Sequence, residues 1–136
     1  MVEDLILNSI IETLKEDDEL IAMLDTFSDK NRKKIPMLIK NIQLPIQWDA
    51  NSNSINIYVV ANNTRVDYTN IYCSISCRAK DYNKSRIMAN KVVDILNRNI
   101  ITSNIFIVAN ISGTIAPSKV GLGSYNTPVE LLIRSR

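Results

Sequence analysis

The chain has 136 residues, of which 46% are hydrophobic and 22% are charged, and its formal net charge is +2. This composition excludes a disordered chain, and the length fits one domain, residues 1–136, with a sizeable core. The sequence contains no histidine, which excludes the Ser/His and Cys/His sites of the commonest hydrolases. We therefore expect no enzyme, and no catalytic, cofactor-binding or metal-binding residues.

The N-terminal segment, residues 1–27, predicts an acidic helical unit. Apolar residues between Leu5 and Leu14 recur every three or four positions, which is typical of an amphipathic helix. A second short helix is expected over 18–24, with Asp17 or Asp18 capping its first turn. Residues 1–29 hold nine acidic residues and one lysine, a net charge of −8, so the rest of the chain carries +10.

The middle of the chain changes to strand patterns. The polar run 28–34 predicts a loop, and 37–44, bracketed by two prolines, predicts an irregular segment or an edge strand. Alternation of side chains then predicts strands over 55–60 and 71–79, joined by a connection at 61–66. One face of the second strand belongs to the core, and the other face contacts water.

The third part of the chain, residues 83–134, predicts a helix and two further strands. The apolar positions of 83–97 follow a helical period, and 105–111 and 128–134 have strand character. The expected body, residues 55–134, is therefore strand, strand, helix, strand, strand. We predict an α+β fold with a mainly antiparallel sheet of about four strands and helices on one face.

Two cysteines, Cys73 and Cys77, lie on the same face of the predicted strand 71–79. At about 13 Å apart they are too distant for a disulfide, so we expect two buried core residues. Free thiols fit a reducing compartment. The N-terminus lacks the basic region of a signal peptide, and no apolar run approaches the ~20 residues that span a bilayer, so we expect a cytoplasmic protein without membrane contact.

The strand 71–79 and the helix after it also carry a resemblance. The strand ends in Ser-Cys-Arg-Ala-Lys-Asp-Tyr, and the helix reads Ser-Arg-Ile-Met-Ala-Asn-Lys-Val-Val-Asp-Ile-Leu-Asn. This pattern, with the short acidic helix at 17–24 before it and the closing strands after it, resembles the phage tail-terminator family, also called tail-completion or tail-to-head joining proteins. The segment 30–49 departs from the family, because it is longer and more apolar than the usual connection.

The resemblance implies a virion structural protein that is assembled in the host cytoplasm. It implies a homo-hexameric ring that caps the phage tail tube, stops its polymerisation and joins it to the head connector or stopper protein. No cofactor is implied. The loops 61–66 and 112–127 are the expected contacts with the tube or the connector.

The charge asymmetry predicts where neighbouring copies meet. A ring needs two different patches on every copy, and an acidic unit facing a basic body supplies them. The expected interface residues are Glu16, Asp17, Glu19, Lys33, Lys34, Arg78, Lys84, Arg86 and Lys119.

Other functions stay open at this point. The protein could be another head-tail connector or a tail tube subunit. It could instead be a nucleic-acid-binding accessory protein using the cluster Lys30, Arg32, Lys33 and Lys34, although specific recognition is not expected without stacking aromatics in a known motif. An enzyme with a metal held by the carboxylates of 16–19 would lose its activity on chelation.

Overall fold

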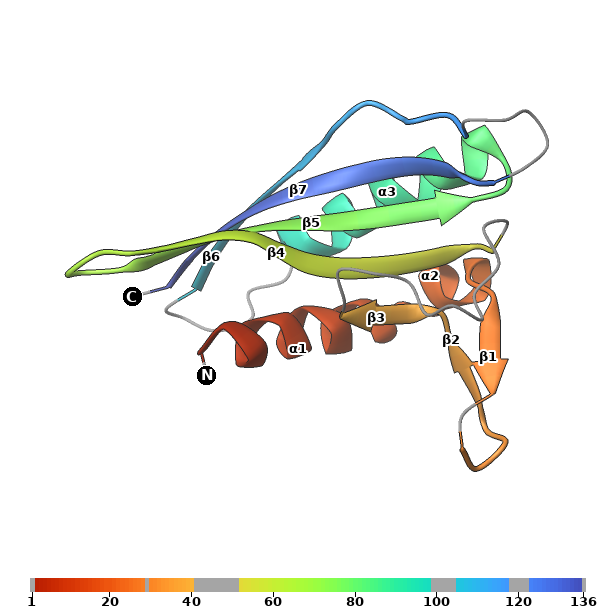
Figure 1. The fold of residues 1–136 in the computed structure, drawn as a ribbon, viewed down its shortest axis with the longest axis horizontal. Helices are drawn as coiled ribbons and strands as arrows, with labels where there is room; N and C mark the ends of the chain where they lie inside the picture. Colours follow the sequence, from red (N-terminus) through yellow and green to blue (C-terminus); the bar gives the residue numbers. More distant parts are fainter. Residues whose placement is uncertain (1, 29, 41–51, 99–104, 118–122, 136) are drawn as a thin grey trace.

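The protein folds into a long twisted sheet with helices packed against one of its faces (Figure 1). The computed structural model describes residues 2–28, 30–40, 52–98, 105–117 and 123–135. Its elements follow the order helix, helix, three short strands, two long strands, helix and two strands. The predicted α+β class is confirmed.

The three helices form where the sequence has helical periodicity. They are α1 (Val2–Lys15), α2 (Asp18–Met23) and α3 (Tyr82–Arg98). Asp17 is the N-cap of α2, and its carboxylate accepts a hydrogen bond of 2.9 Å from the backbone N–H of Leu20. Asp81 precedes α3, and its carboxylate accepts from the backbone N–H of Lys84 at 3.2 Å.

The main sheet has five strands in the order β3-β4-β5-β7-β6. These strands are β3 (Leu38–Lys40), β4 (Ser54–Thr64), β5 (Thr69–Ala79), β6 (Ile105–Ile111) and β7 (Tyr125–Ser135). Neighbours pair antiparallel except β3, which runs parallel to β4 with Leu38 opposite Ile55. The sheet is therefore mixed and has five strands, and the prediction of a mainly antiparallel sheet of about four strands is corrected accordingly.

A second, separate sheet consists of β1 (Thr26–Ser28) and β2 (Lys34–Pro36), paired as a hairpin. The predicted loop over 28–34 is the turn of this hairpin at the described residues 30–33, while its end residues 28 and 34 belong to the two strands, which were not predicted. The apolar residues that pair here, Phe27 and Ile35, are too few to produce a readable strand pattern.

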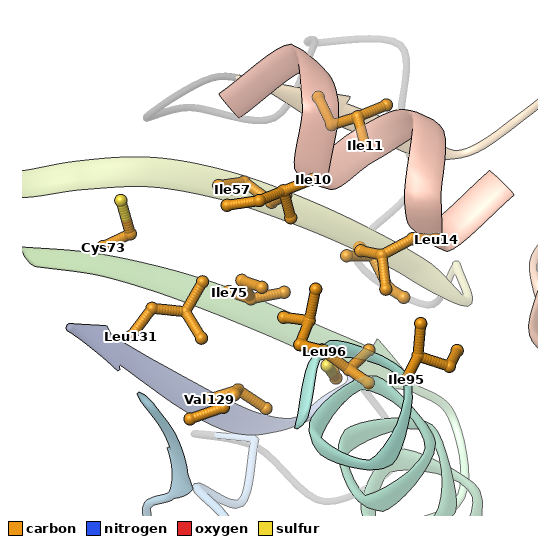
Figure 2. Packing of buried hydrophobic residues seen from close by; sticks show 14 of the residues in the cluster. Ile10, Ile11, Leu14, Ile57, Cys73, Ile75, Ile95, Leu96, Val129 and Leu131 are labelled. Atoms are coloured by element: carbon orange, nitrogen blue, oxygen red, sulfur yellow. The ribbon is translucent and has the colours of Figure 1, made fainter. Parts of the chain in front are cut away.

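The core lies between the inner face of the sheet and the helices. Ile10 and Leu14 of α1 point towards the strands and α3, and Ile75 lies at the centre of the sheet (Figure 2). All three side chains are fully buried. Cys73 and Cys77 also belong to this core as buried thiols that form no disulfide, so that prediction is confirmed.

The connections predicted at 61–66 and 112–127 are partly strand in the structure. β4 continues through Thr64, so most of 61–66 is strand, and the turn lies at 65–68, where the N–H of Arg65 donates to the carbonyl of Tyr68 at 2.7 Å. β7 begins at Tyr125, inside the predicted loop 112–127, and Ile115 pairs with Asn126. The ends of these strands are polar or exposed on both faces, so their sequence shows no alternation.

Candidate assembly surfaces

The β1–β2 hairpin carries a concentration of positive charge that extends away from the body. We call residues 26–36 the basic hairpin. It points away from α1 and from the five-stranded sheet (Figure 1). Its cationic side chains are all exposed, and they are Lys30, Arg32, Lys33 and Lys34. This places two of the predicted interface residues, Lys33 and Lys34, on one projecting element.

The turn of the basic hairpin contains an unusual backbone conformation. Arg32 has a φ of 59°, the left-handed region that glycine and asparagine adopt more readily. It is the one non-glycine residue with positive φ among the described residues. Strained residues of this kind often occur where a side chain has a function, and here the conformation presents a guanidinium at the tip.

The base of the basic hairpin pairs Phe27 with Ile35, and both side chains are half-buried. An isolated two-stranded hairpin is at best marginally stable in water, and packing against another surface stabilises it. The basic hairpin forms a sheet of its own and does not pair with the five-stranded sheet.

The helices α1 and α2 present negative charge on their outer side. We call the exposed carboxylates Glu12, Glu16, Asp18 and Glu19 the acidic helical surface. Glu12 lies 3.8 Å from Lys15 in an exposed pair within α1, which contributes little to stability. The surface includes two of the predicted interface residues, Glu16 and Glu19.

Asp17, a third predicted acidic interface residue, has roles within the chain. Its side chain caps α2 and lies 3.8 Å from Nζ of Lys91 on α3. Glu19 also forms an ion pair with Lys91, while its own side chain is 82% exposed. Asp17 is therefore a structural residue that fastens α2 to α3, and Glu19 belongs to both the chain's own packing and its surface.

The predicted basic residues Arg78, Lys84 and Arg86 lie on β5 and α3, not on the basic hairpin. Arg78 lies on β5 and donates from its guanidinium to Oδ1 of Asn56 at 3.1 Å. Burial lowers the pKa of Arg78, and the nearby Tyr58 and Cys77 act in the opposite direction. The neighbouring Cys77 thiol has its pKa raised to about 12 by burial, so it is protonated and unreactive at neutral pH.

Lys84 and Arg86 lie on α3, and Arg86 faces the chain's own loop. Its guanidinium donates to Oγ1 of Thr114 at 3.0 Å and lies 5.9 Å from the ring centre of Tyr82. Arg86 therefore holds residue 114 against the helix. Lys119, the last predicted interface residue, lies outside the described residues.

Arg86 is the first member of a directional chain of hydrogen bonds. Oγ of the buried Ser85 donates to the carbonyl of Cys77 at 2.7 Å, which uses its single proton. Thr127 must then donate to Ser85 at 2.8 Å, and Thr114 to Thr127 at 2.9 Å, while Thr114 accepts from Arg86. This chain fixes the start of the loop after β6 to α3 and β7.

A second projecting arm is the turn between β4 and β5. Residues 61–67 are all exposed, and Val66 at the tip is entirely so. Figure 1 shows this hairpin extending beyond the rest of the sheet. The sequence predicted a contact at 61–66 with other proteins of an assembly, and the structure gives these residues a position in which such a contact is sterically possible.

Two features of the surfaces were not predicted from sequence. Lys91, which joins α2 to α3, is an ordinary lysine on the polar side of an amphipathic helix, and only the fold brings it next to Asp17. Lys40 at the end of β3 likewise pairs with Asp4 of α1 at 3.3 Å. Both pairs connect residues far apart in the chain, and no local pattern signals them.

Two kinds of site were searched for among the described residues. Among them, no group of three or more Cys, Asp or Glu residues has the arrangement of a metal site, and no helix has both the length and the apolar character needed to span a bilayer. No protein-family model matches the chain, and no curated protein matches it either. The functional argument therefore depends on the two charged surfaces and the two arms.

Proposed function

We propose that this protein is a structural subunit of a homo-oligomeric ring of the phage tail-terminator type. In this function the ring closes the end of a tail tube and presents a surface to a head connector or stopper protein. The chain acts by binding and not by catalysis. The observation that carries the proposal is the separation of a projecting basic hairpin from an acidic helical surface on the same chain.

Separated patches of opposite charge favour a head-to-tail contact. The basic hairpin, with its four exposed cations, points away from α1 (Figure 1), the helix that carries Glu12. A head-to-tail contact joins one patch to the other patch on the next copy, and it forms a closed ring if the rotation between copies closes. The opposite charges also orient the approach of the two copies.

The arms support a role in a larger assembly. The β4–β5 hairpin and the basic hairpin both extend from the body and end in exposed residues. Neither arm is needed to cover the core, whose buried residues lie between the helices and the inner face of the sheet. Arms of this kind suit contacts with a neighbouring subunit or with a tube beneath the ring.

Charge reversal on each surface tests the head-to-tail contact. We expect Lys30→Glu with Lys34→Glu to raise the concentration at which half the protein is assembled by about tenfold or more, because cations that faced carboxylates become acids. Glu12→Lys with Glu16→Lys should have a similar effect. Light scattering over a concentration series measures the mass in each case.

The combined four-residue variant exchanges the two charges and should recover assembly. Lys80→Glu is the control, because Lys80 is exposed and lies outside both surfaces; its mass should equal that of the unmodified protein. If the two reversals leave the mass unchanged, or the combined variant assembles no better than either reversal, the head-to-tail contact does not use these surfaces.

The exposed cations of the basic hairpin also favour a second candidate function, nucleic-acid binding. Phosphate contact requires only accessible positive charge, and its affinity falls steeply with salt. A DNA retention assay at two salt concentrations distinguishes the two candidates. Salt-sensitive retention that Lys30→Glu with Lys34→Glu abolishes, in a protein that stays monomeric, would favour the accessory-protein function over the ring.

A head-tail connector or a tail tube subunit would also form rings. The identity of the proteins that bind the purified ring distinguishes these subunits from a tail terminator.

A further inference from the structure

The face of the sheet opposite the helices carries an organised surface that the charged patches do not explain. Along β5 and β7 the side chains alternate, and Cys73 and Leu131 point to the core and are buried. Their neighbours Tyr72 and Leu132 point the other way. We call the side that contains Tyr72 and Leu132 the open face.

A row of apolar residues crosses the open face. Register pairs Ala61 of β4 with Tyr72 of β5, Tyr72 with Leu132 of β7, and Leu132 with Val108 of β6. Tyr72 is 40% exposed and Val108 is 45% exposed, Ala61 is exposed and Leu132 is half-buried. We call these four residues the apolar belt. An exposed apolar row that spans four strands is typical of an interaction site.

Opposite charges flank the apolar belt on β7. Glu130 lies two positions before Leu132 and Arg134 two positions after it, so both point to the open face, and both are exposed. They are about 13 Å apart along the strand, which is too far for an ion pair with each other. Along β7 the open face therefore presents an acidic residue, Glu130, then Leu132, then a basic residue, Arg134, with Leu132 midway between the two charges.

Arg134 is held in place on the open face by its own neighbours. Its Nε donates to Oδ1 of Asn70 at 3.0 Å, and its guanidinium lies 4.3 Å from the ring centre of Tyr68. The bond to Asn70 uses only one of the three guanidinium nitrogens. A cation with a fixed position loses little conformational entropy when it meets a carboxylate.

We propose that the open face binds the open face of a second copy of this chain, across a two-fold axis that runs along the apolar belt. Such an axis reverses the strand direction of the second copy and keeps each strand at its own position along the belt. Leu132 then faces Leu132, and Glu130 of each copy faces Arg134 of the other. A two-fold contact uses the same patch on both copies, and this patch is complementary to itself.

The pattern favours a second copy over an unrelated partner. The midpoint between Glu130 and Arg134 is Leu132, which is also a residue of the apolar belt, so a two-fold axis through the belt pairs each charge with its opposite. On β5 the belt residue Tyr72 has polar residues, Asn70 and Ser74, two positions away on each side, and both are buried, so the exposed contact consists of the apolar belt and the two charged residues of β7. Two sheets that pack face to face lie about 10 Å apart, with their strands about 30° from parallel. The apolar belt lies at the centre of this contact, and the charged pairs lie at its rim.

This contact goes beyond the ring and is independent of it, because the basic hairpin and the acidic helical surface are not part of the open face. Where both contacts form, two rings are joined. Where only the two-fold contact forms, the protein is a dimer. The two proposals can therefore fail separately.

The test is a charge-swap series read by light scattering and sedimentation over a range of concentrations. Glu130→Arg and Arg134→Glu each place like charges opposite one another twice per contact, and each should weaken the two-fold association by about a hundredfold. The double variant, Glu130→Arg with Arg134→Glu, exchanges the charges and should associate within about tenfold of the unmodified protein. Circular dichroism of all three variants checks that they fold.

A second pair of variants tests the apolar belt. Val108→Lys places a charge in the belt and should abolish the two-fold association, whereas Ile115→Lys changes a somewhat more exposed apolar residue outside the belt and should not. The proposal is overturned if the folded double variant associates as weakly as the single variants, or if Val108→Lys and Ile115→Lys behave alike. The proposal is also overturned if the molecular mass is the same for all variants of the series, whether the protein is a ring or a monomer. The apolar belt would then bind a different protein. A protein that is only dimeric, and responds to the series, supports the two-fold contact while contradicting the ring.

Discussion

The two faces of the five-stranded sheet separate the residues that fold the chain from those available for assembly. On the inner face, Ile75 and its neighbours are covered by α1 and α3 and have no exposed surface. On the open face, Tyr72 and Val108 keep about two fifths of their surface exposed. The comparison shows that apolar residues in one strand can have different tasks, and that their direction in the sheet decides which.

The largest effect is expected from removing a side chain on the inner side. Leu14→Ala leaves a cavity between α1, the sheet and α3 (Figure 2), because Leu14 is fully buried. We expect a loss of about 2–5 kcal/mol in the free energy of unfolding, measured by urea denaturation at a protein concentration where the chain is monomeric. The matched control is Leu5→Ala in the same helix, whose leucine is 67% exposed, with an expected change within about 0.5 kcal/mol. Equal losses would contradict the assignment of inner and outer sides.

A smaller effect is expected from the hydrogen-bond chain at the start of α3. Ser85→Ala leaves the carbonyl of Cys77 and the hydroxyl of Thr127 without their buried partner, and we expect a loss of about 1–3 kcal/mol. Ser9→Ala is the control, because Ser9 makes a comparable bond to the carbonyl of Leu5 at an exposed position. Hydrogen exchange should also become faster at the amide of Ile115, which donates to Asn126. Unchanged exchange there would show that the chain does not hold the loop.

The smallest effect is expected at the turn of the basic hairpin, where stability and assembly should change in opposite directions. Arg32→Gly relieves the left-handed conformation and should raise the monomer's stability by about 0.5–1 kcal/mol. The same variant removes one cation from the tip and should weaken assembly. Lys33→Gly is the matched control, since its φ is not positive and it should gain no stability. A stability decrease for Arg32→Gly would show that this arginine stabilises the folded monomer.

The sequence was sufficient for the elements whose pattern is long and local. The period of the segments that became α1 and α3, and the alternation through Cys73 and Cys77, predicted these elements to within a few residues. The reason is that one side of each element is buried against the same core. Burial on one side produces a period that can be read without knowing the partner.

The elements that sequence analysis missed are short or exposed on both sides. β1 and β2 have three residues each, which is too few for a period. β3 lies within the segment 37–44, predicted as irregular or as an edge strand, and it is an edge strand of the main sheet; only its parallel pairing with β4 was not predicted. The end of β4 is exposed on both faces, so its residues show no alternation. Pairing with a remote partner, and not local composition, makes these segments strands.

The candidate surfaces follow the same rule. Net charge along the chain indicated an acidic unit and a basic remainder, and the cationic cluster of 30–34, visible in the sequence, lies on one projecting hairpin. The sequence could not separate Asp17, which caps α2 and pairs with Lys91, from Glu16, which is exposed. It also could not show the apolar belt, because the belt takes one residue from each of four strands.

The most direct test of the proposed function is the oligomeric state of the unmodified chain. Light scattering at a series of protein concentrations, with negative-stain electron microscopy of the largest species, measures both its mass and its shape. We expect closed rings with a single number of subunits, six for a tail-terminator-type ring, which dissociate as salt screens the contact between the basic hairpin and the acidic helical surface. A protein that stays monomeric at every concentration and salt would contradict the ring.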